Sequence, residues 1–133
     1  MRALQPPGWP RPRGYANGIA VDSGGTLVFV AGQIGWDASG AFPAADLAGQ
    51  VRVALGNVLA VLAEAGGGPE HVVRMTWYVV DRADYLESAP AIGEAYRSVM
   101  GRVYPAMSAV EVSALMEAEA KVEIEVTAVV PSA

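Results

Sequence analysis

The clearest pattern in the chain is a strict alternation of apolar and polar residues near its C-terminus. In residues 121–130, valine, isoleucine and alanine occupy every even-numbered position, and lysine, glutamate and threonine occupy the odd-numbered positions up to residue 127. This period of two predicts a strand with one face in the core and one polar face. A shorter alternation in residues 109–113 predicts a second strand, with Val110 and Val112 facing the core. The carboxylates of both strands would lie opposite the core: Glu111, Glu123 and Glu125.

Two other stretches have helical periodicity. Apolar residues recur every three or four positions in residues 47–62, directly after Asp46, which is a favourable N-cap. The sequence Gly-Gly-Gly-Pro at residues 66–69 is expected to end this helix. A second amphipathic helix is predicted between Pro90, which suits a first helical turn, and Gly101.

Three further strands are predicted from apolar runs at residues 14–21, 26–31 and 72–80. The middle run is apolar almost throughout, which predicts a strand buried on both faces. A hairpin turn is expected at residues 22–25, and a polar turn at residues 81–88.

The order of these elements predicts one α+β domain over residues 1–133, with an irregular N-terminal arm at residues 1–13. We expect a mainly antiparallel sheet with two helices packed on one face. The other face of the sheet has no helix to cover it. Because 53% of the residues are hydrophobic, we expect a partner subunit to cover that face.

Composition excludes several classes of site. The formal net charge is -5 with a single lysine, and no basic stripe is visible, which argues against a nucleic-acid partner. Cysteine is absent and His71, placed just before a predicted strand, is the only histidine, so no metal site is expected. Nucleotide-binding glycine motifs are also missing, and no cofactor is predicted. The apolar runs are too short to span a membrane, which fits a cytoplasmic location.

Several segments together resemble the RidA/YjgF family: GYANGIAV, VFVAGQIGWD, NVLAVLAEAG, PAMSAVEVSAL and KVEIEVTAVV. The resemblance extends over nearly the whole chain, from about residue 14 to residue 130. It implies a chorismate-mutase-like fold and a homotrimer that binds a small molecule in clefts between subunits. It also implies hydrolysis of reactive imines and enamines to keto acids and ammonia.

The resemblance assigns roles to individual residues. Glu123 matches the glutamate linked to the hydrolytic water, and is the candidate catalytic residue. The ordinary alternative for Glu123 and Glu125 is a solvated strand face, and for Trp36 it is simple packing. The candidate ligand-binding residues are Tyr15, Gly32, Gln33, Trp36, Met107 and Glu111.

The chain departs from the family pattern at Met107, where active imine deaminases carry an arginine that clamps the substrate carboxylate. Two further polar positions are changed, at Ala31 and at Ala89-Pro90. A thioether cannot replace a bidentate guanidinium. We therefore expect weak or absent deamination of small imino acids.

Three functions follow as hypotheses. The first is a homotrimer that binds a less anionic or more aromatic metabolite, with deamination or related hydrolysis at Glu123. The second is a non-catalytic trimer that binds a metabolite or another protein. The third, an endoribonuclease or translation inhibitor, is disfavoured because the net charge of -5 opposes nucleic-acid binding.

Overall fold

The main layer of the protein is a four-stranded sheet in the order β3-β6-β4-β5. The computed structural model describes residues 1–22 and 24–132. Its sheet consists of β3 (Gly25–Ile34), β6 (Val122–Pro131), β4 (Val72–Val79) and β5 (Ala106–Glu111). β6 runs antiparallel to both of its neighbours, whereas β4 and β5 are parallel. The predicted α+β, mainly antiparallel architecture is therefore confirmed.

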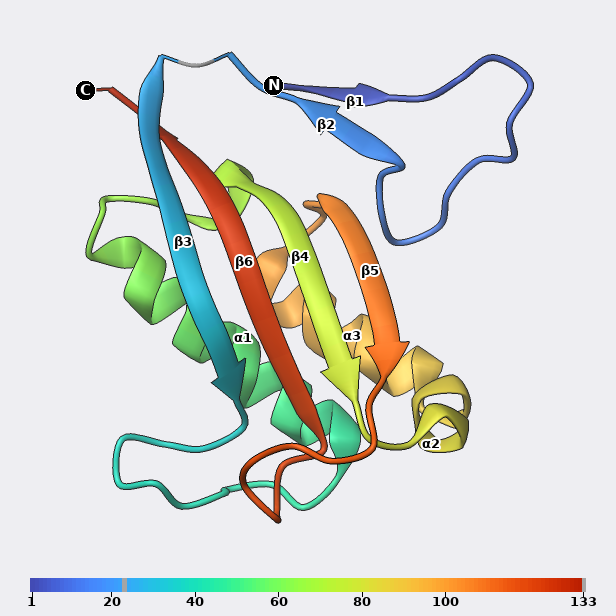
Figure 1. Cartoon of the computed structure of the whole chain (residues 1–133), viewed down its shortest axis with the longest axis vertical. Coiled ribbons are helices and arrows are strands. Elements are labelled where there is room, and N and C mark those ends of the chain that lie inside the picture. The colour runs from blue at the N-terminus through green and yellow to red at the C-terminus, as the bar shows by residue number, and fades with distance from the viewer. Residues whose placement is uncertain (23, 133) are drawn as a thin grey trace.

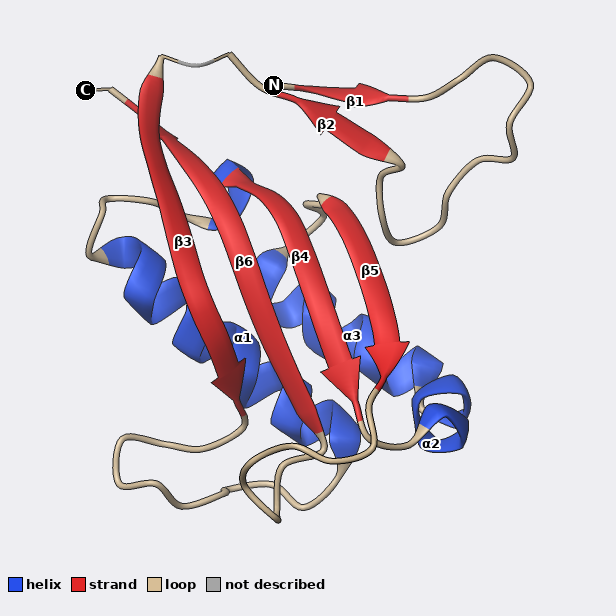
Figure 2. Ribbon diagram, in the orientation of Figure 1, coloured by secondary structure: helices blue, strands red, loops and turns tan. Residues whose placement is uncertain are grey.

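Two helices cover one face of this sheet, as Figures 1 and 2 show. In α1 (Leu47–Ala63), the carboxylate of Asp46 accepts a hydrogen bond from the Gly49 N–H at 3.1 Å, as expected of an N-cap. The helix ends just before Gly66, whose φ of 76° suits glycine. The second helix, α3 (Ala89–Met100), ends at Gly101 as predicted.

The hydrophobic core lies between the sheet and these helices. Strand β6 contributes every second residue to it, and Val122, Ile124 and Ala128 are fully buried. Burying the Val122 or Ile124 side chain contributes about 1.5–3 kcal/mol relative to an exposed position. The alternation in residues 121–130 thus defines the core face correctly.

The N-terminal region differs from the prediction. Residues 1–13 are not wholly irregular, because β1 (Arg2–Leu4) pairs antiparallel with β2 (Gly18–Ala20) in a separate two-stranded sheet (Figure 1). The expected hairpin between residues 14–21 and the next strand is also wrong, since β2 pairs with β1 and β3 pairs with β6. The Leu4 side chain packs over Gly18 across this pair of strands. Ser23, within the expected turn, lies outside the described residues.

The polar turn expected at residues 81–88 is instead a short helix, α2 (Arg82–Glu87). Asp81 caps it by accepting a hydrogen bond from the Asp84 N–H at 3.1 Å. A carboxylate oxygen of Glu111, at the end of β5, accepts from the Arg82 N–H at 2.7 Å. Two carboxylates therefore satisfy N–H groups that a short helix leaves unpaired.

Strand β3 is not buried on both faces within one chain. Val30 is buried against the helices, but the side chains on the other face are open, with Leu27 56% and Phe29 72% exposed. The helices cover only one side of the sheet, so within residues 1–22 and 24–132 nothing covers the second face of this apolar strand. We refer to this uncovered side of the sheet as the open face.

The orientation predicted for β5 is also wrong. Met107 is aligned with Met75, which is fully buried, and packs against the core. Val110 is aligned with Tyr78 and is 46% exposed on the open face. Glu111 therefore projects from the helix side of the sheet. Its charge is tolerated there because it lies at the strand end and binds the start of α2.

Candidate functional site

Gly32 and Glu123 lie against each other on the open face. The pairing of β3 with β6 shifts its register between Val30 and Gln33, so Gly32 lies in a β-bulge. A Cβ built at Gly32 would overlap the Glu123 carboxylate, with its Cδ only 2.7 Å away. Glycine is thus required for this packing of the half-buried Glu123 side chain. This contact brings two of the candidate residues together.

Two polar side chains of α1 hold the segments on either side of this pair. The fully buried Gln50 donates to the Glu119 carbonyl at 3.0 Å and accepts from the Lys121 N–H at 2.8 Å. Asn57 donates to the carbonyls of Ile34 at 3.0 Å and Trp36 at 2.8 Å. These hydrogen bonds fix the end of β3 and the start of β6. Sequence reasoning missed both residues because they interrupt an otherwise apolar helical face.

Tyr78 of β4 and Glu125 of β6 form a polar strip in the middle of the open face. The Tyr78 hydroxyl donates a 2.7 Å hydrogen bond to the Glu125 carboxylate. This bond, more than the accompanying desolvation and the charges of Glu125 and Glu123, raises the pKa of Tyr78. Arg74 and Phe29 help to line a depression of about 360 Å³ alongside. Tyr78 could have been placed on this face from the period of two in its strand.

Met107 lines a different pocket, of about 300 Å³, between α3 and the edge of the sheet. Tyr104 is shared by this pocket and by an adjoining one of about 550 Å³ that Tyr15 lines. The Ala16 N–H donates to the Pro105 carbonyl at 2.9 Å, which holds the segment carrying Tyr15 beside β5. Tyr15 and Met107 therefore line two adjoining pockets, with Tyr104 between them.

The remaining candidate residues have mainly local contacts. Gln33 donates to the Ala31 carbonyl at 3.0 Å. Trp36 packs on Phe42, with ring centroids 6.3 Å apart. Glu111 binds the start of α2, as described above. These contacts give Trp36 and Glu111 structural roles in the single chain.

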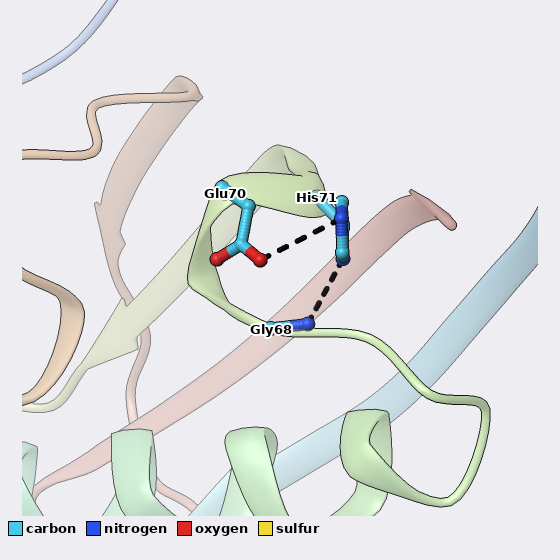
Figure 3. A network of polar contacts seen from close by, with 3 residues as sticks. All are labelled: Gly68, Glu70 and His71. Carbon is cyan, nitrogen blue, oxygen red and sulfur yellow. Dashed lines mark hydrogen bonds and ion pairs between the residues drawn. The ribbon is translucent and has the colours of Figure 1, made fainter. Parts of the chain in front are cut away.

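His71 has a local role at the start of β4. In the short 3-10 helix η1 (Pro69–His71), its Nδ1 accepts a hydrogen bond from the Gly68 N–H at 3.0 Å, and its Nε2 lies 3.6 Å from the Glu70 carboxylate (Figure 3). Across residues 1–22 and 24–132, no three His, Asp or Glu side chains form a metal-binding group. Among the same residues, no helix is long and apolar enough to span a membrane.

The candidate residues thus form two groups on opposite sides of the sheet. Gly32 and Glu123 lie on the open face, whereas Met107 and its neighbour Tyr104 lie on the helix side. The sheet separates the two groups within one chain. This geometry defines an α+β protein with one helix-covered face and two separate halves of a potential site.

Comparison with known proteins agrees with this architecture. Residues 11–130 match the family model described as Endoribonuclease L-PSP. A 2-iminobutanoate/2-iminopropanoate deaminase of Salmonella typhimurium is 34% identical over 86% of each chain. The crystal structure of the Rid family protein YyfB from Yersinia pestis, described as of unknown function, has a TM-score of 0.84 at 30% identity and covers 97% of this chain and 98% of that one.

Escherichia coli TdcF, solved with bound serine, has a TM-score of 0.67 at 32% identity, covering 97% of this chain and 98% of TdcF. The chain therefore belongs to the RidA/YjgF family. Its relatives include proteins named as imine deaminases, and its fold is the chorismate-mutase-like fold that the resemblance implied.

Proposed function

We propose that the protein is a homotrimer that hydrolyses an imine or enamine in a cleft between subunits. The observation that carries this proposal is the placement of the Glu123 carboxylate over Gly32. The two are positioned by a β-bulge, a feature often found next to active sites. The deaminase names of relatives at about 34% identity support the same reaction class.

The open face supports self-association. Leu27 and Phe29 project from β3 without cover in the single chain. A second copy packed over β3 would remove this apolar area from water, at about 25 cal/mol per Å². The polar strip around Tyr78 and Glu125 would lie beside this contact.

A cleft containing both groups of residues needs two chains. Met107 and Glu123 lie on opposite sides of one sheet, so one subunit would supply Glu123 and Gly32, and its neighbour would supply Met107, Tyr104 and Tyr15. Such a head-to-tail contact closes into a ring, as in a trimer. Each ring would contain equivalent clefts at its interfaces.

The chemistry requires a base and water. Glu123 accepts a proton from water as the water oxygen bonds to the carbon of the protonated imine, giving a neutral carbinolamine. Glu123 then returns the proton to nitrogen, the C–N bond breaks, and the departing ammonia takes the remaining hydroxyl proton. The sum is iminium plus water giving a carbonyl compound plus ammonium. General acid–base catalysis of this kind contributes about 10²–10⁴-fold.

Met107 limits the substrate range. It cannot donate the paired hydrogen bonds that a guanidinium gives to a carboxylate. Because hydrogen bonds to charged groups contribute about 1.5–3 kcal/mol each, small imino acids should bind about two to four orders of magnitude more weakly than with arginine at this position. Larger apolar substrates would depend less on that contact.

The experiment uses an L-amino-acid oxidase to generate imino acids from phenylalanine or leucine, with semicarbazide as a competing trap. Acceleration of keto-acid formation is expected with the parent protein, and Glu123→Gln should reduce it at least about 100-fold. Glu125→Gln is the matched control on the same strand. Equal rates for the parent and Glu123→Gln would overturn the proposed reaction.

Position 107 gives a second arm of the same assay. Met107→Arg should accelerate hydrolysis of the small imine made by threonine dehydratase, on which the parent should be nearly inactive. Because Met107 lines the pocket, the new side chain can pack its apolar stem where Met107 packs and extend its guanidinium into the pocket. A parent that hydrolyses this imine as fast as the Arg variant would contradict the role given to Met107.

The second candidate function is metabolite binding without turnover. The lack of a hydrogen-bond donor at Met107 favours it. It predicts that a ligand raises the melting temperature while no ammonia is released from any imine tested. Release of ammonia that depends on Glu123 would exclude it.

A further inference from the structure

The pocket lined by Met107 has a strongly aromatic wall. Trp77, Tyr96 and Tyr104 form a continuous series, with ring centroids 6.3 Å apart for the first pair and 5.7 Å for the second. Tyr96 and Tyr104 are nearly parallel, at 13°. Tyr96 is fixed further because its hydroxyl donates to the Val103 carbonyl. The partly exposed Tyr104 ring forms the outer end of this series and borders the pocket.

The same pocket carries positive charge. Its lining includes Arg13 and Arg97 but no aspartate or glutamate, although the whole chain has a formal net charge of -5. Among the described residues, the one ion pair joins Glu70 and His71, so neither arginine has a carboxylate partner there. An unneutralised guanidinium beside an aromatic surface is suited to an organic anion.

Arg97 of α3 lines this pocket with its guanidinium lying along the helix. Gly93 lies four residues earlier, on the same helical face. The Nη1 atom of Arg97 lies 3.2 Å from where a Cβ of Gly93 would be. The absence of a side chain at Gly93 therefore lets the guanidinium lie along the helix surface, where both residues line the pocket.

We propose that this pocket binds the carboxylate of an aromatic acid, with Arg97 as the anion-binding residue and Tyr104 and Met107 as the apolar wall. The inference rests on the proposed function, because it gives the Met107 half of that site its substrate class, aromatic 2-imino or 2-keto acids. The volume of about 300 Å³ lies at the lower end of that of small-molecule sites. Arg97 thereby supplies, from α3, the charge that position 107 lacks.

The test is calorimetry of the whole protein with phenylacetate, its neutral analogue phenylacetamide, and butyrate, which lacks the ring. Phenylacetate should bind tightest of the three. Arg97→Gln should weaken phenylacetate about 10–100-fold and leave phenylacetamide unchanged. Arg97→Lys, which keeps the charge but not the planar fork, should give an intermediate affinity.

Arg102→Gln is the matched control, since Arg102 is exposed near the end of α3 and does not line the pocket. It should bind phenylacetate as the parent does. Equal phenylacetate affinity in the parent and Arg97→Gln would overturn the inference, as would no preference for phenylacetate over phenylacetamide in the parent.

Failure here is distinguishable from failure of the proposed function. If phenylacetate binding depends on Arg97 but no imine is hydrolysed, the aromatic-acid pocket is supported and the proposed hydrolysis is contradicted. If Glu123-dependent hydrolysis occurs but Arg97→Gln leaves the KM for the phenylalanine-derived imine unchanged, the proposed hydrolysis is supported and the role of Arg97 in the pocket is contradicted.

Discussion

The two faces of the central sheet are built from the same strands but have different chemistry. On the helix side, Met75, Ile124 and Val126 pack into a core closed by α1 and α3. On the open face, the same strands present Tyr78 and Glu125, hydrogen-bonded to each other. One face is complete within a single chain, whereas among the described residues nothing packs over the polar groups and exposed apolar residues of the other. The difference teaches that the core is encoded on one face, while the other is left exposed for the assembly proposed above.

The largest effect should come from Phe29→Asp, on the open face. A charge in place of an apolar side chain at a subunit contact would be desolvated without a partner, so the oligomer should dissociate completely. The folded chain should keep its stability, because Phe29 is 72% exposed within it. Light scattering should report 13.8 kDa for the variant and about three times that mass for the parent.

Met116→Asp is the control for this variant, because Met116 is 96% exposed and lies outside the sheet. It should retain the mass of the parent. A parent protein that is monomeric at micromolar concentration, or a Phe29→Asp variant that remains trimeric, would contradict an interface on this face.

Substitutions at two neighbouring residues of β6, one on each face of the sheet, should differ in their effect on the free energy of unfolding. Ile124→Ala leaves a cavity in the core and should cost about 2–5 kcal/mol of unfolding free energy. Glu125→Ala removes one exposed hydrogen bond and should cost no more than about 1 kcal/mol in the dissociated Phe29→Asp background. Urea denaturation monitored by circular dichroism measures both. Similar losses for the two variants would argue against a one-sided core.

The smallest effect concerns tyrosine ionisation. Burial, and to a lesser extent the nearby Tyr104, raises the pKa of Tyr96 above its ordinary value of 10.0. The unfolded chain then releases this proton first, so the stabilising contribution is complete below pH 10.0 and declines as pH rises above it. The slope is at most about 1.4 kcal/mol per pH unit for each tyrosine.

Tyr96→Phe should therefore flatten the alkaline decline in unfolding free energy, measured by urea titration at successive pH values. At neutral pH it should cost about 0.5–1.5 kcal/mol, because its hydrogen bond to the Val103 carbonyl is lost. An alkaline slope identical to that of the parent would show that Tyr96 is not the responsible group.

Much of the helix-covered face was predictable from local pattern. The alternation in residues 121–130, the Asp46 cap and the glycines after α1 each encode their structure within a few residues. The short helix α2 was missed because one of its stabilising carboxylates, Glu111, comes from a distant strand. The N-terminal strand β1 was missed because its three residues are too few to carry an apolar pattern.

The candidate site was predictable as a set of residues but not as an arrangement. The Gly32–Glu123 contact depends on the register of β3 against β6, which local pattern does not specify. The orientation of β5 did not follow, because its alternation of small residues fits either face. Only the parallel register with β4, which aligns Met107 with the buried Met75, decides it. This register places Met107 on the side of the sheet opposite Glu123.

The central claim is that Glu123 of one chain and Met107 of another form one cleft. The parent has no cysteine, so Met107→Cys and Glu123→Cys can be introduced together and cross-linked with a short bis-maleimide. Each single variant can link at most two chains. The double variant should give covalent trimers on a denaturing gel, because each chain contributes both halves of neighbouring clefts. A double variant that is trimeric by light scattering but yields no covalent trimer would contradict the account.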